Sequence, residues 1–244
     1  MKSAGTILGC VAVRSSGRVV GVNAVLENLR LRPPRHFDNA AEWLQALGGV
    51  PLERIVFDPW PGTATEEDLL LFVERDKRLC ELIDGTLVEK PMGYWESLIA
   101  IALAARLSIY ADEHDLGSVS GADSTLRMSS SGRVRLPDVA FISKARLPTT
   151  SNPIPTIAPD LAVEVLSEGN TTEEMAQKLL EYFESGTVLA WVIDPKTRTV
   201  KVYHRPGQPT QVLEVDGTLD GEKVLPGFAM PVAELFRKLP QGDE

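Results

Sequence analysis

Two apolar runs of the sequence each contain one carboxylate where a buried strand is expected. Glu164 lies within residues 159–167 (PDLAVEVLS), and Asp138 lies within residues 134–142 (VRLPDVAFI). An ionised carboxylate in such a strand costs several kcal/mol unless a cation or good hydrogen-bond partners receive it. Two acids on adjacent strands suit Mg²⁺, which prefers oxygen ligands and keeps waters for a substrate. The pattern therefore predicts a hydrolytic metal site, and the alternative places the acids at frayed strand ends in solvent.

An amine follows Glu164 by fourteen residues. Thr171 and Glu174 form a capping-box pattern that predicts a helix ending before Gly186. Lys178 lies at the edge of the apolar stripe of this helix, so its ammonium group can reach past the sheet edge toward Glu164. The alternative is a snorkelling lysine, with its charge in water and its methylene groups on the apolar surface.

A third acid, Glu96, lies in the first turn of a long helix expected from about Gly93 to Glu113. The period of 3.6 residues places it on the apolar stripe that contains Ile99 and Leu103, where an apolar residue is expected. Glu96 is therefore interpreted either as a further acid of the site or as a first-turn glutamate favoured by the helix dipole. Glu81 and Glu89, which flank a hairpin turn, are assigned to solvated strand positions.

Turn and capping signals define the elements that must position these residues. Asp84-Gly85 is a two-residue hairpin signal, and Thr65 with Asp68 begins a helix that extends to about Asp76. The order of elements indicates a mixed α/β sheet with helices on both faces, an added N-terminal β-hairpin and a C-terminal β element. Residues 1–50 are assigned to an N-terminal extension, partly disordered with one short helix, and residues 51–240 to the main domain. The other expected elements are a helix over 39–47, a hairpin of 117–128 with 133–142, strands at 188–193 and 199–204, a small β element over 206–228 and a helical turn over 232–238.

Composition narrows the class of protein. The chain has 244 residues, 43% of them apolar, and a net charge of −9. This acidity counts against nucleic-acid binding over the whole surface, although a local basic groove stays compatible with it. No segment is long and apolar enough to span a bilayer, and two distant cysteines give no zinc or disulfide pattern. A cytoplasmic protein is expected, without a Ser-His-Asp elbow, a phosphate-binding glycine loop or a dinucleotide fingerprint.

These motifs, in this order and spacing, resemble the PD-(D/E)xK nuclease superfamily and, more narrowly, the Uma family of putative restriction endonucleases. The segments that carry the resemblance are residues 81–85 (ELIDG), 136–141 (LPDVAF), 159–167 (PDLAVEVLS), 178–182 (KLLEY) and 191–195 (WVIDP). The resemblance covers about residues 52–236 and implies a restriction-endonuclease-like core. It also implies that Asp138 and Glu164 bind Mg²⁺, or Mn²⁺ in its place, and that the Val165 carbonyl adds a ligand.

One position departs from the superfamily pattern. Leu166 stands two residues after Glu164, where the superfamily has its lysine, so the resemblance implies that Lys178 supplies the amine from the next helix. Glu96 matches the first-helix acid of the superfamily. The sequence thus predicts an Mg²⁺-dependent endonuclease acting on DNA. The alternative is a catalytically inactive module that binds DNA or protein, and the interpretation leaves a homodimer open.

Overall fold

A computed structural model of the protein describes residues 37–240. The expectation of disorder for the start of the chain falls on residues 1–36 and lies outside the described residues. Helix α2 (Ala40–Ala46) begins after Asn39, whose side chain accepts hydrogen bonds from two backbone N–H groups of the first turn. Leu47 and Val50, which follow the helix, pack against Ile83 and Val88. Helix α2 therefore belongs to the same compact unit as the rest of the described residues.

A six-stranded mixed sheet forms the centre of the fold, with the order β10-β9-β8-β7-β6-β3. Its two central strands, β7 and β8, are parallel and are connected through helix α5 (Thr172–Glu184), while all other neighbours are antiparallel. The strands are β3 (Gly117–Gly121), β6 (Val139–Ser143), β7 (Leu161–Val165), β8 (Leu189–Asp194), β9 (Thr199–Tyr203) and β10 (Gln211–Leu213).

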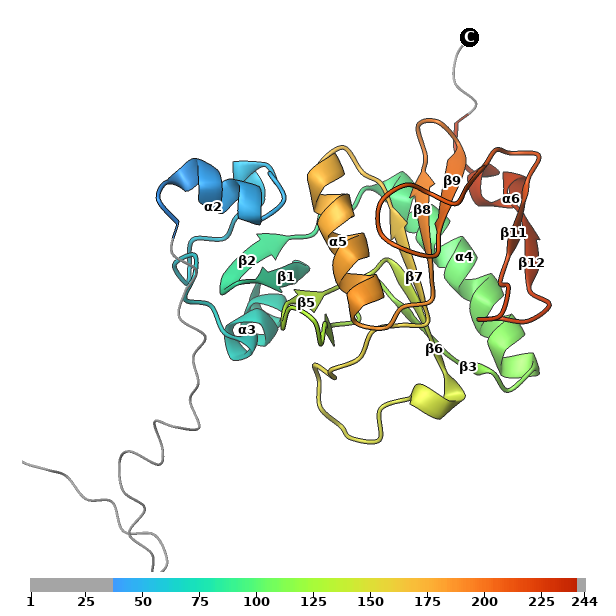
Figure 1. Cartoon of the computed structure of the whole chain (residues 1–244), viewed down its shortest axis with the longest axis horizontal. Helices are drawn as coiled ribbons and strands as arrows, with labels where there is room; N and C mark the ends of the chain where they lie inside the picture. Colours follow the sequence, from blue (N-terminus) through green and yellow to red (C-terminus); the bar gives the residue numbers. More distant parts are fainter. Residues whose placement is uncertain (1–36, 241–244) are drawn as a thin grey trace, which may run out of the picture. The chain divides into compact units, whose positions relative to one another are not determined.

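Helices cover both faces of this sheet, as the sequence predicted (Figure 1). Helix α4 (Tyr94–Glu113) packs on the face that carries the alternate β7 residues Leu161, Val163 and Val165. Helix α5 packs on the other face, where β6, β7 and β8 each contribute an alanine: Ala140, Ala162 and Ala190. These small side chains let α5 approach the sheet closely, so that polar groups on the helix reach the strands.

A second, four-stranded antiparallel sheet has the order β2-β1-β5-β4. Its strands are β1 (Cys80–Ile83), β2 (Thr86–Glu89), β4 (Leu126–Arg127) and β5 (Val134–Arg135), and α3 (Glu66–Asp76) packs against β1. The predicted hairpin over residues 117–142 therefore divides between the two sheets. Pro137 stands between β5 and β6, and because proline has no N–H to donate, the ladder breaks there.

The remaining elements are short and close the ends of the fold. One 3₁₀ turn spans Leu52–Arg54, and another spans Lys144–Arg146. Strands β11 (Thr218–Asp220) and β12 (Ala229–Pro231) form the predicted C-terminal β element, followed by helix α6 (Ala233–Phe236). Both predicted capping boxes are present, Thr65 with Asp68 and Thr171 with Glu174. Among residues 37–240, no helix combines the length and the apolar character that crossing a bilayer requires.

The β1–β2 turn gives a test of the second sheet. Gly85 has φ +75°, and a Cβ there would lie 2.6 Å from the carbonyl oxygen of Gly62. Gly132 has the same φ but has open space around it. We predict that Gly85→Ala destabilises the protein by about 3 kcal/mol and Gly132→Ala by about 1 kcal/mol, because only the first adds a backbone clash to the left-handed strain. Urea unfolding measures both, and equal losses would contradict the close packing of the two turns.

Candidate active site

The two acids singled out in the sequence lie together on the α5 face of the central sheet. Val139 pairs with Val163 in the β6–β7 ladder, which sets Asp138 next to Glu164. The Asp138 N–H donates to the Val163 carbonyl oxygen at 2.9 Å, and its Oδ2 accepts from the Val165 N–H at 2.6 Å. Asp138 is 5% exposed and Glu164 is 4% exposed. The alternative of solvated strand ends is therefore wrong for both residues.

Lys178 contacts Glu164 directly. Its Nζ lies 3.2 Å from Glu164 Oε2, and one turn later the Tyr182 hydroxyl donates to Glu164 Oε1 at 2.6 Å. The side chain of Lys178 is 2% exposed, so the snorkelling alternative, which needs the ammonium group in water, is wrong. The spacing of four residues on α5 places the two donors on one side of the helix, facing the strand.

Glu81 is the acid whose position the sequence analysis predicted wrongly. It is 1% exposed, and its Oε1 lies 2.9 Å from Lys178 Nζ and accepts from the Leu136 N–H. Its Oε2 accepts from Arg135 Nη1 at 2.8 Å. The signal was present, because Glu81 stands among Cys80 and the apolar residues of β1, the same pattern that identified Glu164.

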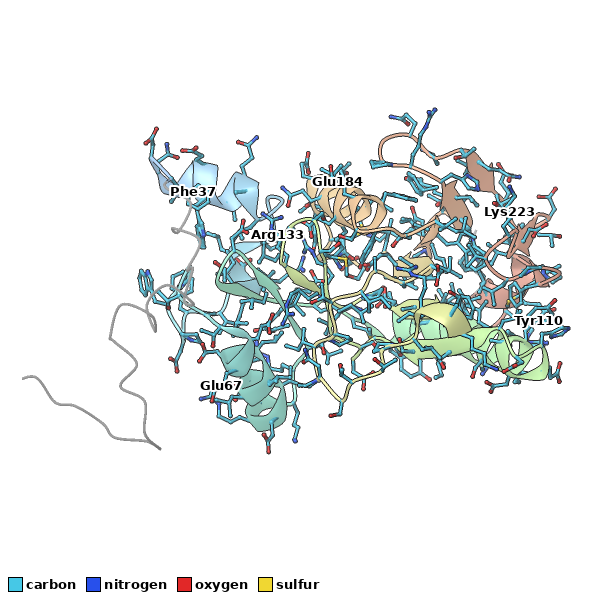
Figure 2. The ribbon with its side chains drawn as sticks, turned by 60° about the horizontal axis from the view of Figure 1, so that its bottom comes forward. Phe37, Glu67, Tyr110, Arg133, Glu184 and Lys223 are labelled. Carbon is cyan, nitrogen blue, oxygen red and sulfur yellow. The ribbon has the colours of Figure 1, made fainter. Side chains whose placement is uncertain are left out.

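The ion pairs continue from Glu81 toward the surface. Arg135 also donates two hydrogen bonds to Glu181 on α5, at 2.7 and 2.9 Å. Glu181 in turn accepts from Arg133 at 2.6 Å, and Arg133 pairs with Asp84 in the hairpin turn. Figure 2 shows Arg133 between α2 and α5, and its Nη2 donates to the carbonyl oxygen of Ala46. The second sheet is thereby joined to α5 by charged hydrogen bonds.

Lys90 is a second amine at the site. Its Nζ lies 2.8 Å from Asp138 Oδ1 and 2.5 Å from the Leu136 carbonyl oxygen, and its side chain is 3% exposed. The residue stands just after β2, and nothing in its local sequence, Glu89-Lys90-Pro91, distinguishes it from a solvated strand end. Its place beside Asp138 follows from the packing of the two sheets.

The charges around the two acids of Lys178 are unequal. Burial raises the pKa of Glu164 above its usual value, and the neighbouring Asp138 raises it further against the opposing effect of Lys178. Burial also acts on Glu81, but Lys178 and Arg135 outweigh it and lower the pKa of Glu81 to about 2. Burial opposes the charge of Lys178 too, but Glu164 and Glu81 outweigh it and hold the pKa of Lys178 above its ordinary value. Of Glu164 and Glu81, Glu164 is therefore the acid whose ionised form an added cation would stabilise more.

The donor set fits a hard divalent ion. Each oxygen of Asp138 and Glu164 accepts one protein donor, and a carboxylate has about four lone-pair sites, so acceptor capacity is left. Within residues 37–240, no group of three or more His, Cys, Asp or Glu side chains is placed to hold a metal ion. Mg²⁺ commonly binds through one or two carboxylates and keeps several waters, which matches a two-acid site. The Val165 carbonyl stays a predicted ligand.

Glu96 lies apart from the buried acids. It is half-buried in the first turn of α4, and its carboxylate lies against Gly93. In the described part of the chain no hydrogen bond or ion pair joins it to Asp138 or Glu164. It lines a groove of about 730 Å³ together with Ser167 and Glu168, just after the Glu164 strand. The catalytic role of Glu96 stays a prediction.

Two short segments pack against each other near Lys90. Arg54 donates to the Gly169 carbonyl oxygen at 2.7 Å and forms two hydrogen bonds with Glu174. A Cβ at Gly169 would lie 3.0 Å from Pro91, so glycine permits the close approach of the segment that begins at Lys90. The groove beside Glu96, to which Pro91 and Gly169 both contribute, is lined by neither Asp138 nor Glu164.

Comparison with known proteins decides the family. A family model described as "Putative restriction endonuclease", Uma2, matches residues 66–233, which contain the whole arrangement of Glu81, Asp138, Glu164 and Lys178. The chain belongs to the Uma2 family. A search of curated proteins gave no match.

A solved structure supports the same fold. It is a "putative nuclease belonging to DUF820" from Anabaena variabilis ATCC 29413, with a TM-score of 0.59 and 24% sequence identity. The match covers 66% of this chain and 91% of the other. The predicted restriction-endonuclease-like fold of this Uma2 protein is confirmed.

The unequal charges predict opposite effects for two matched substitutions. Glu81→Gln removes an ionised acid and leaves Arg135 and Lys178 undercompensated, so we expect a loss of about 3 kcal/mol at pH 7. Glu164→Gln removes an acid whose ionised form burial disfavours, so we expect unchanged or slightly higher stability.

Because the folded pKa of Glu164 exceeds its unfolded value near 4.5, the wild type loses stability as the pH rises through that folded value. The glutamine of the Glu164→Gln variant cannot titrate, so this variant should lack that loss of stability. Denaturant unfolding between pH 4 and 8 measures the effect, and similar stabilities for the two variants would contradict this account.

Proposed function

We propose that this Uma2 protein is an Mg²⁺-dependent endonuclease that hydrolyses phosphodiester bonds in DNA. The observation that carries the proposal is the buried pair Asp138 and Glu164, with the charged amine of Lys178 at hydrogen-bond distance from Glu164. The family and the structural neighbour support nuclease chemistry. The same arrangement is what phosphodiester hydrolysis needs, namely oxygen ligands for a cation and a nearby positive donor.

Each residue has a distinct task in this proposal. Asp138 and Glu164 would hold Mg²⁺ (with Mn²⁺ as a substitute), and the Val165 carbonyl oxygen is the third candidate ligand. An ion held there would supply Lewis-acid chemistry, namely polarisation of a phosphoryl oxygen and a lower pKa for its bound water. Lys178 uses two of its three N–H donors on Glu81 and Glu164 within the described chain, which leaves one to orient the attacking water or stabilise charge on phosphorus.

Tyr182 and Glu81 act as positioning residues. The Tyr182 hydroxyl fixes one oxygen of Glu164, and Glu81 keeps the Lys178 ammonium group charged and in place. Glu96, at the groove, is placed to assist from outside the buried cluster.

The groove beside Glu96 supports DNA as the substrate. Lys196 and Arg198, from the turn between β8 and β9, line it together with Tyr94 and Trp95 at the start of α4. Tyr94 is 69% exposed and Trp95 is 40% exposed. Cations that contact phosphates and exposed rings that stack on bases are the two features of surfaces that bind nucleic acid strands. Two acids, Glu96 and Glu168, line the same groove, and Glu168 pairs with Lys196, so a bound strand would have to take Lys196 from Glu168. The two cations and two exposed rings are the features that support DNA binding on a chain with net charge −9.

The cleavage assay is the direct test. Purified wild type should cleave plasmid or single-stranded DNA with Mg²⁺ and should stop when a chelator is added. Glu164→Gln should reduce cleavage by a factor of about 10² or more, because it removes a ligand charge. Glu113→Gln, a matched change at an exposed position near the end of α4, should cleave like the wild type. An inactive wild type that still binds DNA or a protein would support the alternative, a binding module without catalysis.

The groove has its own test in the salt dependence of binding. We predict that the double variant Lys196→Ala/Arg198→Ala binds DNA about tenfold or more weakly. The slope of log K against log salt concentration should fall in magnitude by about 2, since two phosphate contacts are lost. Lys144→Ala, an exposed lysine paired with Asp115, is the control. Equal slopes for the double variant and the wild type would remove this groove from the DNA-binding surface.

A further inference from the structure

We propose that Lys90 is a built-in counter-ion of Asp138 that holds the place of the divalent ion, so that metal binding requires its ammonium group to leave. The inference rests on the metal site of the proposed function. It adds a residue that neither the sequence motifs nor the family match identifies, and it assigns the two amines of the site different roles.

The first argument is the position of the ammonium group. Lys90 Nζ lies 2.8 Å from Asp138 Oδ1 and 2.5 Å from the Leu136 carbonyl oxygen, with the side chain almost completely buried. Asp138 Oδ2 accepts the Val165 N–H, and Lys90 lies on the other oxygen of the carboxylate, Oδ1. A divalent ion and an ammonium group on one carboxylate oxygen repel each other strongly in a buried site.

The second argument is that the Lys90 ammonium group lies at the pair of acids. Asp138, which it contacts, is the neighbour of Glu164 across the β6–β7 ladder. A cation at this place occupies the region in which an Mg²⁺ shared by the two acids would bind.

The third argument separates Lys90 from Lys178. Lys178 lies between Glu164 and Glu81, so it keeps a carboxylate partner even when Glu164 turns to a metal ion. Lys90 has Asp138 as its only carboxylate ion-pair partner within residues 37–240. The metal therefore competes with Lys90 and leaves Lys178 in place.

The fourth argument is that a groove beside Lys90 offers an alternative position for its side chain. It begins the segment between β2 and α4, and the next residues, Pro91 and Met92, line the groove of about 730 Å³. The backbone N–H of Lys90 donates to the Leu79 carbonyl oxygen, which anchors the main chain while the long side chain can turn. Glu96 and Glu168 line the same groove and can receive the released ammonium group.

The test compares metal binding in neutral variants of Lys90. Lys90→Met and Lys90→Gln both remove the charge, and the glutamine can still hydrogen-bond to Asp138, which protects the fold. Calorimetric titration with Mg²⁺ and with Mn²⁺, at fixed pH and salt, measures affinity without any substrate. Thermal unfolding with the same ions, and with chelator, measures the metal-induced shift in Tm.

We expect each foldable variant to bind the ion about tenfold or more tightly than the wild type, with a lower metal-free Tm and a larger metal-induced rise. Lys144→Met, which removes an exposed charge elsewhere, should match the wild type, and Lys90→Gln/Asp138→Asn should lose the response. Equal or weaker binding by both variants, beside normal binding by the wild type, would overturn the role of Lys90 and leave the metal site standing. If neither the wild type nor the variants bind an ion, the metal site of the proposed function fails as well.

Discussion

The burial of acids between two sheets and one helix is the constraint on which the rest of the structure depends. Five of the six acids that are buried among residues 37–240 pair with five cations: the acids are Glu81, Asp138, Glu164, Glu174 and Glu181, and the cations are Arg54, Lys90, Arg133, Arg135 and Lys178. The sixth acid, Asp160, pairs separately with Arg146. Buried pairs of this kind give little net stability compared with apolar residues, yet removing one partner costs several kcal/mol. Because such a network adds little stability of its own, its presence supports the catalytic role that we propose for this site.

Helix α5 is the element through which the network is assembled. Lys178 lies four residues after Glu174, and Glu181 and Tyr182 lie three and four residues after Lys178, so all four lie along one side of the helix. Glu174 serves twice, as the acid of the capping box and as the partner of Arg54. The β1–β2 hairpin, which the sequence presents as an addition to the core, supplies Glu81 and borders Lys90. It is a structural part of the site.

Local signals predicted most elements and two of the acids, because capping boxes, hairpin turns and an acid in an apolar run are each encoded within a few residues. Such signals single out Asp138, Glu164 and Lys178, and the same signal, an acid among apolar strand residues, is present at Glu81. Lys90 had no local signal, since its burial depends on how the two sheets pack. The division of the 117–142 hairpin depends on Pro137. This proline is visible in the sequence, but it does not by itself indicate that the segments on its two sides join different sheets. Glu96 was placed on the correct helix, yet the register of that helix puts its carboxylate beside the groove.

The break at Pro137 makes chain length as important as residue type. Asp138 follows the break directly and reaches the α5 face only because Val139 pairs with Val163. A strand alternates faces at every residue, so one residue inserted between Asp138 and Val139 would carry the carboxylate to the α4 side, into an apolar layer. The turn over residues 129–132, at the other end of β5, lies outside this stretch. In descendants of this sequence, length variation should therefore be found in that turn rather than between Asp138 and Ser143.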